Sequence, residues 1–138
     1  MGLFGWSEDH IVHLPEIDAE HENIFRLGRE LCEAIAAGAP EPRVKQMFGD
    51  LTEAAAAHFS HEERLMKKAG YSSLAWHKQS HDAVRKRVAE CLPWIDDGEL
   101  DTCSEFLKYL YDWLNDHAGI ADRMMASYLR NRARSRAA

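Results

Sequence analysis

The sequence lacks the features that mark several large classes of protein. Its three cysteines, Cys32, Cys91 and Cys103, are widely spaced and form no CxxC pair. We therefore expect no disulfide framework and interpret them as buried thiols. No apolar run approaches the roughly 20 residues of a membrane-spanning helix, so no membrane insertion is expected. The first residues lack a basic segment followed by an apolar one, which predicts no secretory signal and a cytoplasmic location.

Basic residues are also in short supply. The chain has 17 lysines and arginines against 23 acidic residues, a net charge of −6. Four of the 17 are arginines within residues 130–138, "RNRARSRAA", and removing them leaves 13 basic residues against 23 acidic ones. Such an acidic body argues against a surface that binds nucleic acid. We interpret the Arg-rich tail as a solvated, frayed terminus rather than as a segment that binds an acidic partner.

Helical periodicity dominates what is present. Turn residues at 38–40, 70–72 and 97–98 separate four segments in which apolar residues recur every three or four positions, and no strand-like alternation appears. Short connections between long helices favour antiparallel neighbours. The sequence therefore predicts an all-α protein, an up-down-up-down antiparallel four-helix bundle with an N-terminal arm.

The expected organisation is a single domain over residues 1–138. It comprises an arm over 1–17, the bundle over 18–129 and the Arg-rich tail. Pro93 is expected to kink or end the third helix, because proline lacks an N–H and clashes with the preceding turn. In the fourth segment, the predicted inward face continues through Ala121 and Met124.

Polar residues interrupt the inward faces of all four predicted helices. A buried polar group costs a few kcal/mol unless it finds a partner, so a common explanation is needed. With a rise of ~1.5 Å per residue, these residues reach the same level near one end of the bundle. Bundle cores form metal sites in this way. The residues are His21, His58, Glu62, His77, His81 and His117.

The spacing of these residues suits a pair of metal ions. His58 and Glu62 are four residues apart, so they share a helix face, and the same spacing recurs in "HKQSH". His117 and Asp122 are five apart, roughly 140° around an ideal helix, and Gly119 between them is expected to relax that geometry. Two six-coordinate metals would take five imidazoles, two bridging carboxylates and a shared oxide or hydroxide, with one position left open. Imidazole with carboxylate suits iron and disfavours magnesium or calcium.

With these motifs in this order, the sequence resembles the hemerythrin family in its bacterial single-domain form. The matching pieces are Trp6, "IDAEH", "HFSHEERLM", "AGY", "HKQSH" and "WLNDHAGIAD", which together cover residues 6–122. The resemblance implies two non-haem iron ions per chain with an oxo or hydroxo bridge. By the same resemblance, His77, His81 and His117 hold one iron, His21 and His58 hold the iron with the open position, and Glu62 and Asp122 bridge. The neighbouring His61 and Glu63 are interpreted as non-ligands, and replacing Glu63 is expected to leave the centre intact.

The resemblance also implies reversible dioxygen binding, for delivery, storage or sensing. Azide, other small anions and nitric oxide would be further ligands. The implied apolar pocket contains Phe59, Trp113 and Leu114, and Ala118 stands where the family usually has isoleucine. That replacement predicts a wider pocket, unless Phe59, Trp113 or Ile120 shifts to fill it.

We expect a binding protein rather than an enzyme, because catalytic di-iron bundles usually carry more carboxylates. The alternative is a di-iron enzyme acting on oxygen, peroxide or nitric oxide. Two further histidines, His10 and His13 in the arm, are expected at the surface rather than among the ligands. The oligomeric state is left open.

Overall fold

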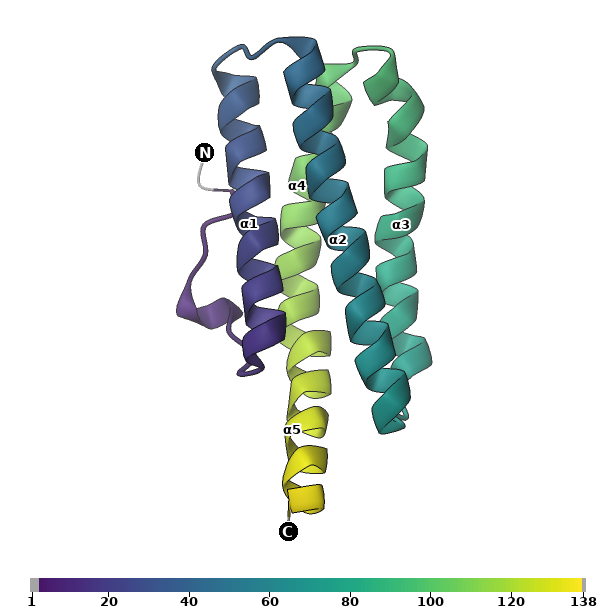
Figure 1. Cartoon of the computed structure of the whole chain (residues 1–138). Helices are drawn as coiled ribbons and strands as arrows, with labels where there is room; N and C mark the ends of the chain where they lie inside the picture. The colour runs from purple at the N-terminus through teal and green to yellow at the C-terminus, as the bar shows by residue number, and fades with distance from the viewer. Residues whose placement is uncertain (1–2, 138) are drawn as a thin grey trace.

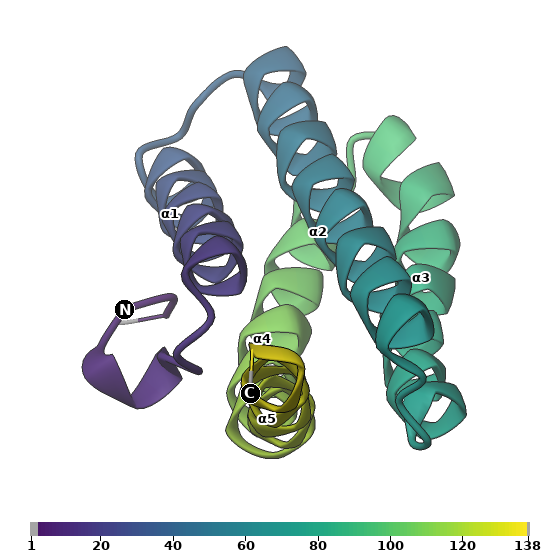
Figure 2. The ribbon, with the colours of Figure 1, turned by 60° about the horizontal axis from the view of Figure 1, so that its bottom comes forward.

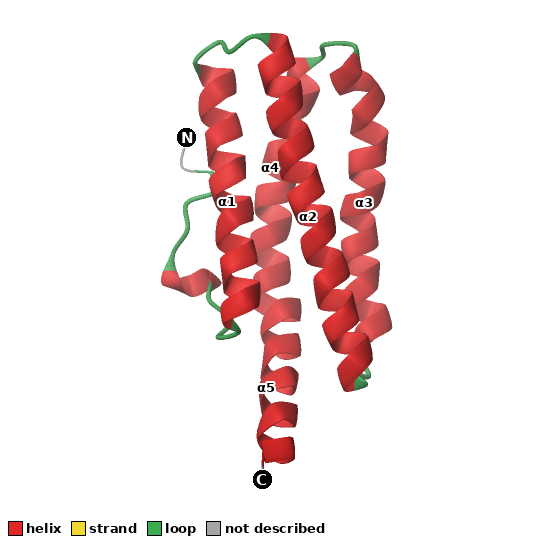
Figure 3. Cartoon of the chain, viewed as in Figure 1, coloured by secondary structure: helices red, strands yellow, loops and turns green. Residues whose placement is uncertain are grey.

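The computed structural model describes residues 3–137, and all regular structure in that range is helical (Figure 3). This confirms the predicted all-α class. Residues 1, 2 and 138, the ends of the predicted domain, lie outside the described part. The elements in chain order are the 3-10 turn η1 (Glu8–His10), α1 (Pro15–Ala36), α2 (Glu41–Ala69), α3 (Leu74–Asp96), α4 (Leu100–His117), the π-helical turn η2 (Ala118–Asp122) and α5 (Arg123–Ala137).

The four long helices form the predicted up-down-up-down bundle. Each helix packs against the next along the chain, and α4 closes the ring against α1 (Figure 2). The turns from α1 to α2 and from α3 to α4 lie at one end of the bundle, and the turn from α2 to α3 lies at the other (Figure 1). Each turn contains a glycine in the left-handed region, with φ of 73° at Gly38, 68° at Gly70 and 85° at Gly98. Glycine adopts this conformation without the steric cost that a Cβ brings.

Three predicted boundaries differ from the structure. Helix α1 begins at Pro15, because proline is well suited to the first helical turn, so residues 15–17 belong to the bundle and not to the arm. Pro93 was predicted to kink or end the third helix; α3 passes through Pro93 and ends at Asp96, so the second of these two outcomes is wrong. Pro93 lies in the last turn of α3, and the missing N–H of proline costs the helix one backbone hydrogen bond there. The Arg-rich segment is helical through Ala137, and α5 extends beyond the bundle rather than fraying (Figure 1).

Two apolar clusters fill the bundle, and the polar residues lie between them. Along α1, Ile17 belongs to the smaller cluster and Ile24 to the larger one, while the intervening inward residue is His21. Met66 of α2 and Met125 of α5 also belong to the smaller cluster, and both are fully buried. The polar layer is therefore sealed on both sides by side chains that exclude water. Among the described residues, no helix combines the length and the apolar character needed to cross a membrane.

The N-terminal arm is anchored in a notch that α1 provides. Phe4 is fully buried, and a Cβ placed on Gly28 would lie 2.6 Å from its ring. Trp6 packs edge-on against Phe25, with ring centroids 5.3 Å apart. His10, expected at the surface, is instead half-buried between Trp6 and Phe25, and its Nε2 lies 2.8 Å from the Oδ1 atom of Asn115. His13 is exposed, as predicted.

Replacing Gly28 with alanine is expected to destabilise the protein by about 1–3 kcal/mol, since the new methyl group would displace the Phe4 ring from the core. The matched control is Gly49→Ala, because a Cβ on Gly49 meets nothing within 4 Å and Gly49 lies inside α2. That change should stabilise the protein by about 0.5–1 kcal/mol. Urea denaturation of both variants measures the difference. Equal free energies of unfolding in the two variants would show that the Phe4 ring accommodates a methyl group at position 28 without cost.

The three cysteines lie on α1, α3 and α4 and form no disulfide. Cys91 and Cys103 are buried and Cys32 is half-buried. Burial raises the pKa of Cys103 to about 12, and the nearby thiols of Cys32 and Cys91 add to this shift. A thiol with a raised pKa is a poor nucleophile, which agrees with the interpretation of these residues as packing groups.

Candidate metal centre

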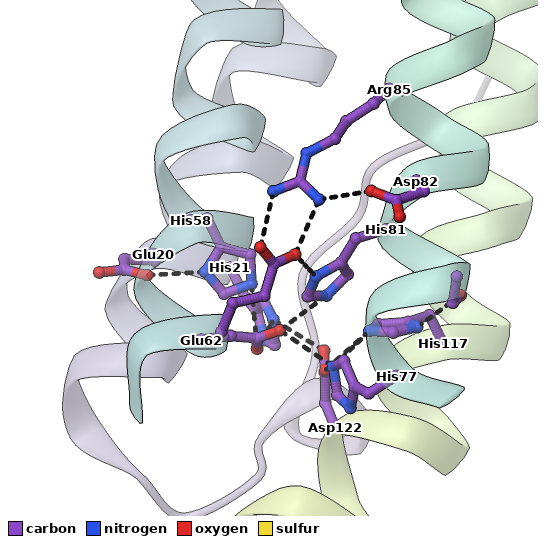
Figure 4. Close-up of polar contacts among 12 residues, drawn as sticks. Glu20, His21, His58, Glu62, His77, His81, Asp82, Arg85, His117 and Asp122 are labelled. Atoms are coloured by element: carbon purple, nitrogen blue, oxygen red, sulfur yellow. Dashed lines mark hydrogen bonds and ion pairs between the residues drawn. The ribbon is translucent and has the colours of Figure 1, made fainter. Parts of the chain in front are cut away.

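The seven predicted ligands meet inside the bundle, in the layer between the two apolar clusters (Figure 4). Every one is buried, with 0–6% of its surface exposed. They come from all four helices and the π turn: His21 from α1, His58 and Glu62 from α2, His77 and His81 from α3, His117 from α4 and Asp122 from η2. Neither His61 nor Glu63 belongs to this cluster.

The cluster consists of two overlapping groups, each compact enough to hold one metal ion. Within each group, one donor atom per residue lies within 4.8 Å of all the others. One group has three histidines and the other has two, and both groups contain the same two carboxylates. The three-histidine group is Glu62, His77, His81, His117 and Asp122, and the two-histidine group is His21, His58, Glu62 and Asp122.

Glu62 turns a different oxygen toward each group. Its Oε1 lies 3.0 Å from His81 Nε2 and 3.2 Å from His77 Nε2. Its Oε2 lies 3.2 Å from His58 Nε2 and 3.7 Å from His21 Nε2. A carboxylate with its two oxygens divided in this way is placed to bridge two metal ions.

Asp122 divides its oxygens in the same manner. Its Oδ1 lies 2.9 Å from His117 Nε2 and 3.1 Å from His77 Nε2. Its Oδ2 lies 3.0 Å from His21 Nε2. The two carboxylates therefore face each other across the cluster as a pair of bridges.

A π-helical turn brings Asp122 onto the face of His117. The α-helical geometry would separate these residues by roughly 140°, whereas a π turn pairs residues five apart. The turn spans Ala118–Asp122 and includes Gly119, although a Cβ on Gly119 would meet nothing within 4 Å. The extra residue also shifts the following register by one, which overturns the prediction for Met124. Met124 is 49% exposed, and Met125 is buried in its place.

The hydrogen-bonding pattern favours a proton or a metal ion among these atoms. A carboxylate only accepts hydrogen bonds, so His58 must donate its Nδ1–H to Glu20, and in the neutral ring its Nε2 then carries a lone pair that faces Glu62. Two nitrogens, Nε2 of His77 and Nε2 of His117, lie only 3.0 Å apart. Lone pairs that face each other repel unless a proton or a metal ion lies between them. In addition, five buried atoms have no well-directed hydrogen bond, although some lie close to one another: both ring nitrogens of His21, Oε2 of Glu62, Oδ1 of Asp122 and Nδ1 of His77.

Electrostatics within the cluster lead to the same conclusion. Burial lowers the pKa of His58, but the charge on Glu62 and the hydrogen bond to Glu20 outweigh it and raise the pKa to about 10. Burial also lowers the pKa of His77, and bonds to Asp122 and Glu62 reverse this and raise it to about 9. The carboxyl groups show the converse: burial raises their pKa, and the histidines more than offset it, so both pKa values lie well below the ordinary range. The cluster attracts positive charge, which a metal ion would supply.

Two carboxylates outside the cluster orient ligand histidines. Glu20 Oε1 accepts a hydrogen bond from His58 Nδ1 at 2.6 Å (Figure 4). Glu63 Oε2 accepts one from His81 Nδ1 at 2.8 Å. Such bonds fix which ring nitrogen faces a metal. Glu20 was not among the residues predicted from the sequence, and Glu63 was predicted to be dispensable, whereas the structure places Glu63 against a predicted ligand.

The sequence predicts that such acceptors exist, but it does not show which residues they are. A ligand histidine needs an acceptor for the N–H of its second ring nitrogen, so a polar residue is expected beside each one. Each carboxylate reaches its histidine across a helix–helix contact, from α1 to α2 and from α2 to α3. Sequence spacing alone does not show which neighbour makes that reach. The same holds for Ser80, whose hydroxyl lies 2.9 Å from Nδ1 of His117.

Aromatic side chains cover the three-histidine group. Phe59 stacks on His81, with ring centroids 4.3 Å apart, and Trp113 stacks on His117 at the same distance. The two aromatic rings also contact each other edge-on. Phe59 and Trp113, predicted to line the oxygen pocket, thus lie mainly against the histidines of one metal position.

The other two predicted pocket residues, Leu114 in the last turn of α4 and Ala118 at the start of η2, are both buried. Leu114 is 3% exposed and Ala118 is 4% exposed. Ile120 is 60% exposed, so it does not fill the space that the small Ala118 side chain leaves. The arm instead contacts this region, because η1 packs against η2.

Comparison with known proteins shows to which family this chain belongs. The sequence model described as the Hemerythrin HHE cation binding domain matches residues 12–129. The chain belongs to the hemerythrin family. Among hemerythrin relatives, the bacteriohemerythrin of Stenotrophomonas maltophilia (strain R551-3) is 30% identical over 130 residues, which cover 94% of this chain and 84% of that protein. The myohemerythrin of Sipunculus nudus is 27% identical over 117 residues, which cover 85% of this chain and 86% of that protein.

A crystal structure of wild-type hemerythrin has the same fold. Its TM-score to this chain is 0.71 at 22% sequence identity, and the match covers 91% of this chain and 96% of that chain. The division of ligands implied by the hemerythrin resemblance and the two groups formed by the structure contain the same seven residues.

Proposed function

We propose that this protein binds dioxygen reversibly at a non-haem di-iron centre. Two iron ions per chain, joined by an oxo or hydroxo bridge, would be held by the seven clustered residues. His77, His81 and His117 would hold one iron, His21 and His58 the other, and Glu62 and Asp122 would bridge. Family membership supports the proposal, since similar proteins in Stenotrophomonas maltophilia and Sipunculus nudus are named bacteriohemerythrin and myohemerythrin.

One observation carries the proposal: the two metal positions share both carboxylates but differ by one histidine. With equal coordination numbers, the position of His21 and His58 has one ligand fewer from the protein. That position is therefore the one at which a small molecule would bind. Iron bound there would supply the coordination site, and the two iron ions together would supply the electrons that dioxygen binding needs, one from each.

The rest of the chain protects this position from water. The clusters on both sides of the polar layer and the buried side chains of Leu114 and Ala118 make its surroundings apolar. Charged products of oxygen reduction are poorly solvated in such surroundings, so their escape is disfavoured and binding stays reversible. Glu20 and Glu63 hold two ligand rings in fixed orientations, so the centre needs little rearrangement.

The donor set supports iron and supports binding over catalysis. Zinc usually takes four ligands, whereas each of the two groups, together with the oxo or hydroxo bridge, would supply more than four. Catalytic di-iron bundles typically use four glutamates and two histidines, whereas this site has five histidines and two carboxylates. A di-iron enzyme is therefore the less favoured function. The cytoplasmic location and the absence of a nucleic-acid partner stay predictions.

Spectroscopy of the reduced protein tests the proposed function. The iron-loaded protein is reduced without air, oxygen is admitted, and the visible spectrum is recorded before and after evacuation. We expect a new absorption band that disappears under vacuum and returns with oxygen. A spectrum that changes once and never reverts would favour an oxidase-like reaction, and a protein that takes up no iron would overturn the proposal.

Replacing Ala118 with isoleucine is expected to slow both autoxidation of the oxygenated form and the binding of azide. Isoleucine adds three carbons to a wall that keeps water and anions from the open position. Stopped-flow absorbance measures both rates in the iron-loaded protein. The control is Gly119→Ala, because Gly119 is exposed and a Cβ there meets nothing. Unchanged rates in a folded, fully loaded Ala118→Ile protein would show that Ala118 does not limit access.

A further inference from the structure

The two orienting carboxylates serve different metal positions. Glu20 accepts the Nδ1–H of His58, which belongs to the two-histidine group (Figure 4). Glu63 accepts that of His81, which belongs to the three-histidine group. A negatively charged carboxylate that accepts the N–H of the outer ring nitrogen makes the imidazole a stronger donor to its metal. The effect grows with the charge that the carboxylate keeps after its other contacts are counted.

The charge on Glu63 is largely neutralised by an arginine. Arg85 Nη1 lies 2.8 Å from Glu63 Oε2, and Arg85 Nη2 lies 3.2 Å from Oε1, so the guanidinium binds both oxygens. The same Nη1 also donates to Asp82 at 2.9 Å. A guanidinium carries its positive charge at every pH that a protein tolerates.

The charge on Glu20 has no such partner. Its second oxygen lies 2.6 Å from Nδ1 of His61, and among residues 3–135, whose side chains are described, no lysine or arginine forms an ion pair with Glu20. Arg64 lines the same surface pocket without pairing with it. Both oxygens of Glu63 thus pair with a permanently charged guanidinium, whereas both oxygens of Glu20 contact only imidazole nitrogens. Glu20 therefore presents more net negative charge to its ligand than Glu63 does.

We propose that Glu20 and Glu63 are positioning residues that make the two metal positions unequal in reduction potential. Glu20 makes the position of His21 and His58 easier to oxidise, and Arg85 cancels most of the same effect at the other position. The physical reason is that a ferric ion carries one more positive charge than a ferrous ion, so nearby negative charge stabilises it. The proposal rests on the proposed function, because it requires iron at both positions. It places the more oxidisable iron at the position where the ligand would bind.

The test compares midpoint potentials of the iron-loaded full-length variants Glu20→Gln, Glu63→Gln and Arg85→Gln. Glutamine still accepts a hydrogen bond, so the substitution removes charge while it keeps the ring oriented. The matched control is Glu22→Gln, because Glu22 is exposed on the same helix as Glu20. Anaerobic spectroelectrochemistry at about pH 8, above the ordinary pKa of histidine, resolves the one-electron steps.

We expect Glu20→Gln to raise one midpoint by about 59 mV, which is a tenfold change in that reduction equilibrium. Glu63→Gln should raise a midpoint by less. Arg85→Gln should lower one, because it exposes the charge of Glu63. This opposite sign separates electrostatics from a loss of structure, since a merely loosened site gives no reason for a lower potential.

The outcomes are distinguishable. If Glu20→Gln matches the Glu22→Gln control, or if Arg85→Gln fails to lower a midpoint, the proposal is wrong. If Glu20→Gln binds fewer than two irons, the sign of the Arg85→Gln shift decides. Iron content is measured first. If the unsubstituted protein does not bind two irons, the proposed function is overturned, and this inference with it.

Discussion

Replacing Glu62 with alanine is expected to remove iron from both metal positions. Glu62 Oε1 faces His77 and His81, and Oε2 faces His58, so one substitution takes a donor from each group. The histidines left behind would repel one another in a fully buried space. We expect iron to fall from about two per chain to well below one after anaerobic reconstitution, measured by elemental analysis. Replacing His77 should lower the content sharply but less completely, because His77 belongs to the three-histidine group alone.

Two other glutamates of α2 make this result specific. Glu53→Ala is the neutral control, because Glu53 is exposed on the same helix. Glu63→Ala should fall between the extremes, since the loss of an outer hydrogen bond to a ligand typically costs 10–100-fold in metal affinity. This revises the expectation from sequence that Glu63 is dispensable. Two irons retained in a folded Glu62→Ala protein would show that Glu62 does not bridge.

Much of the fold could be predicted because local signals and packing agree. The glycine turns, the three- and four-residue apolar spacing and the short connections all favour the same bundle. The convergence of His21, His58 and His117 could also be predicted, because the rise per residue of an α-helix is fixed. Where the helical geometry is regular, counting along the chain places a side chain in space.

The predictions failed where the geometry is irregular or where contacts cross between helices. The π turn at Ala118–Asp122 adds one residue to the register, so Met125 is buried and Met124 is not. The five-residue spacing of His117 and Asp122 signalled an irregularity there without fixing its form. The Glu20–His58 pair depends on how α1 and α2 pack, which sequence spacing does not determine. Irregular features of this kind often occur at functional sites.

Removing the metal is expected to leave a protein whose stability falls as the pH rises above neutrality. In the metal-free cluster, the pKa of His58 is raised to about 10 and that of His77 to about 9. Both values exceed the ordinary histidine pKa of about 6.5, so their contribution is complete below about pH 6.5 and is lost as the pH rises through 9–10. Glu62 and Asp122 act at the other end of the scale, because their lowered pKa values give stability that is lost as the pH falls. Burial lowers the pKa of His117, which also disfavours low pH.

Bound iron should abolish the loss of stability above neutrality. Metal ions bind deprotonated histidines and release their protons, so metal affinity increases as the pH rises. Because the ligand histidines then carry no proton in either the iron-loaded folded state or the unfolded state, the iron-loaded protein should keep its stability over the range where the metal-free protein loses a few kcal/mol. Urea denaturation of both forms at about pH 6 and about pH 9 measures the two trends. We expect the difference between the forms to widen with pH. If the metal-free protein is equally stable at both pH values, the histidines do not carry the shared protons that the geometry requires. A constant difference between the two forms would mean that iron binds without displacing protons from them.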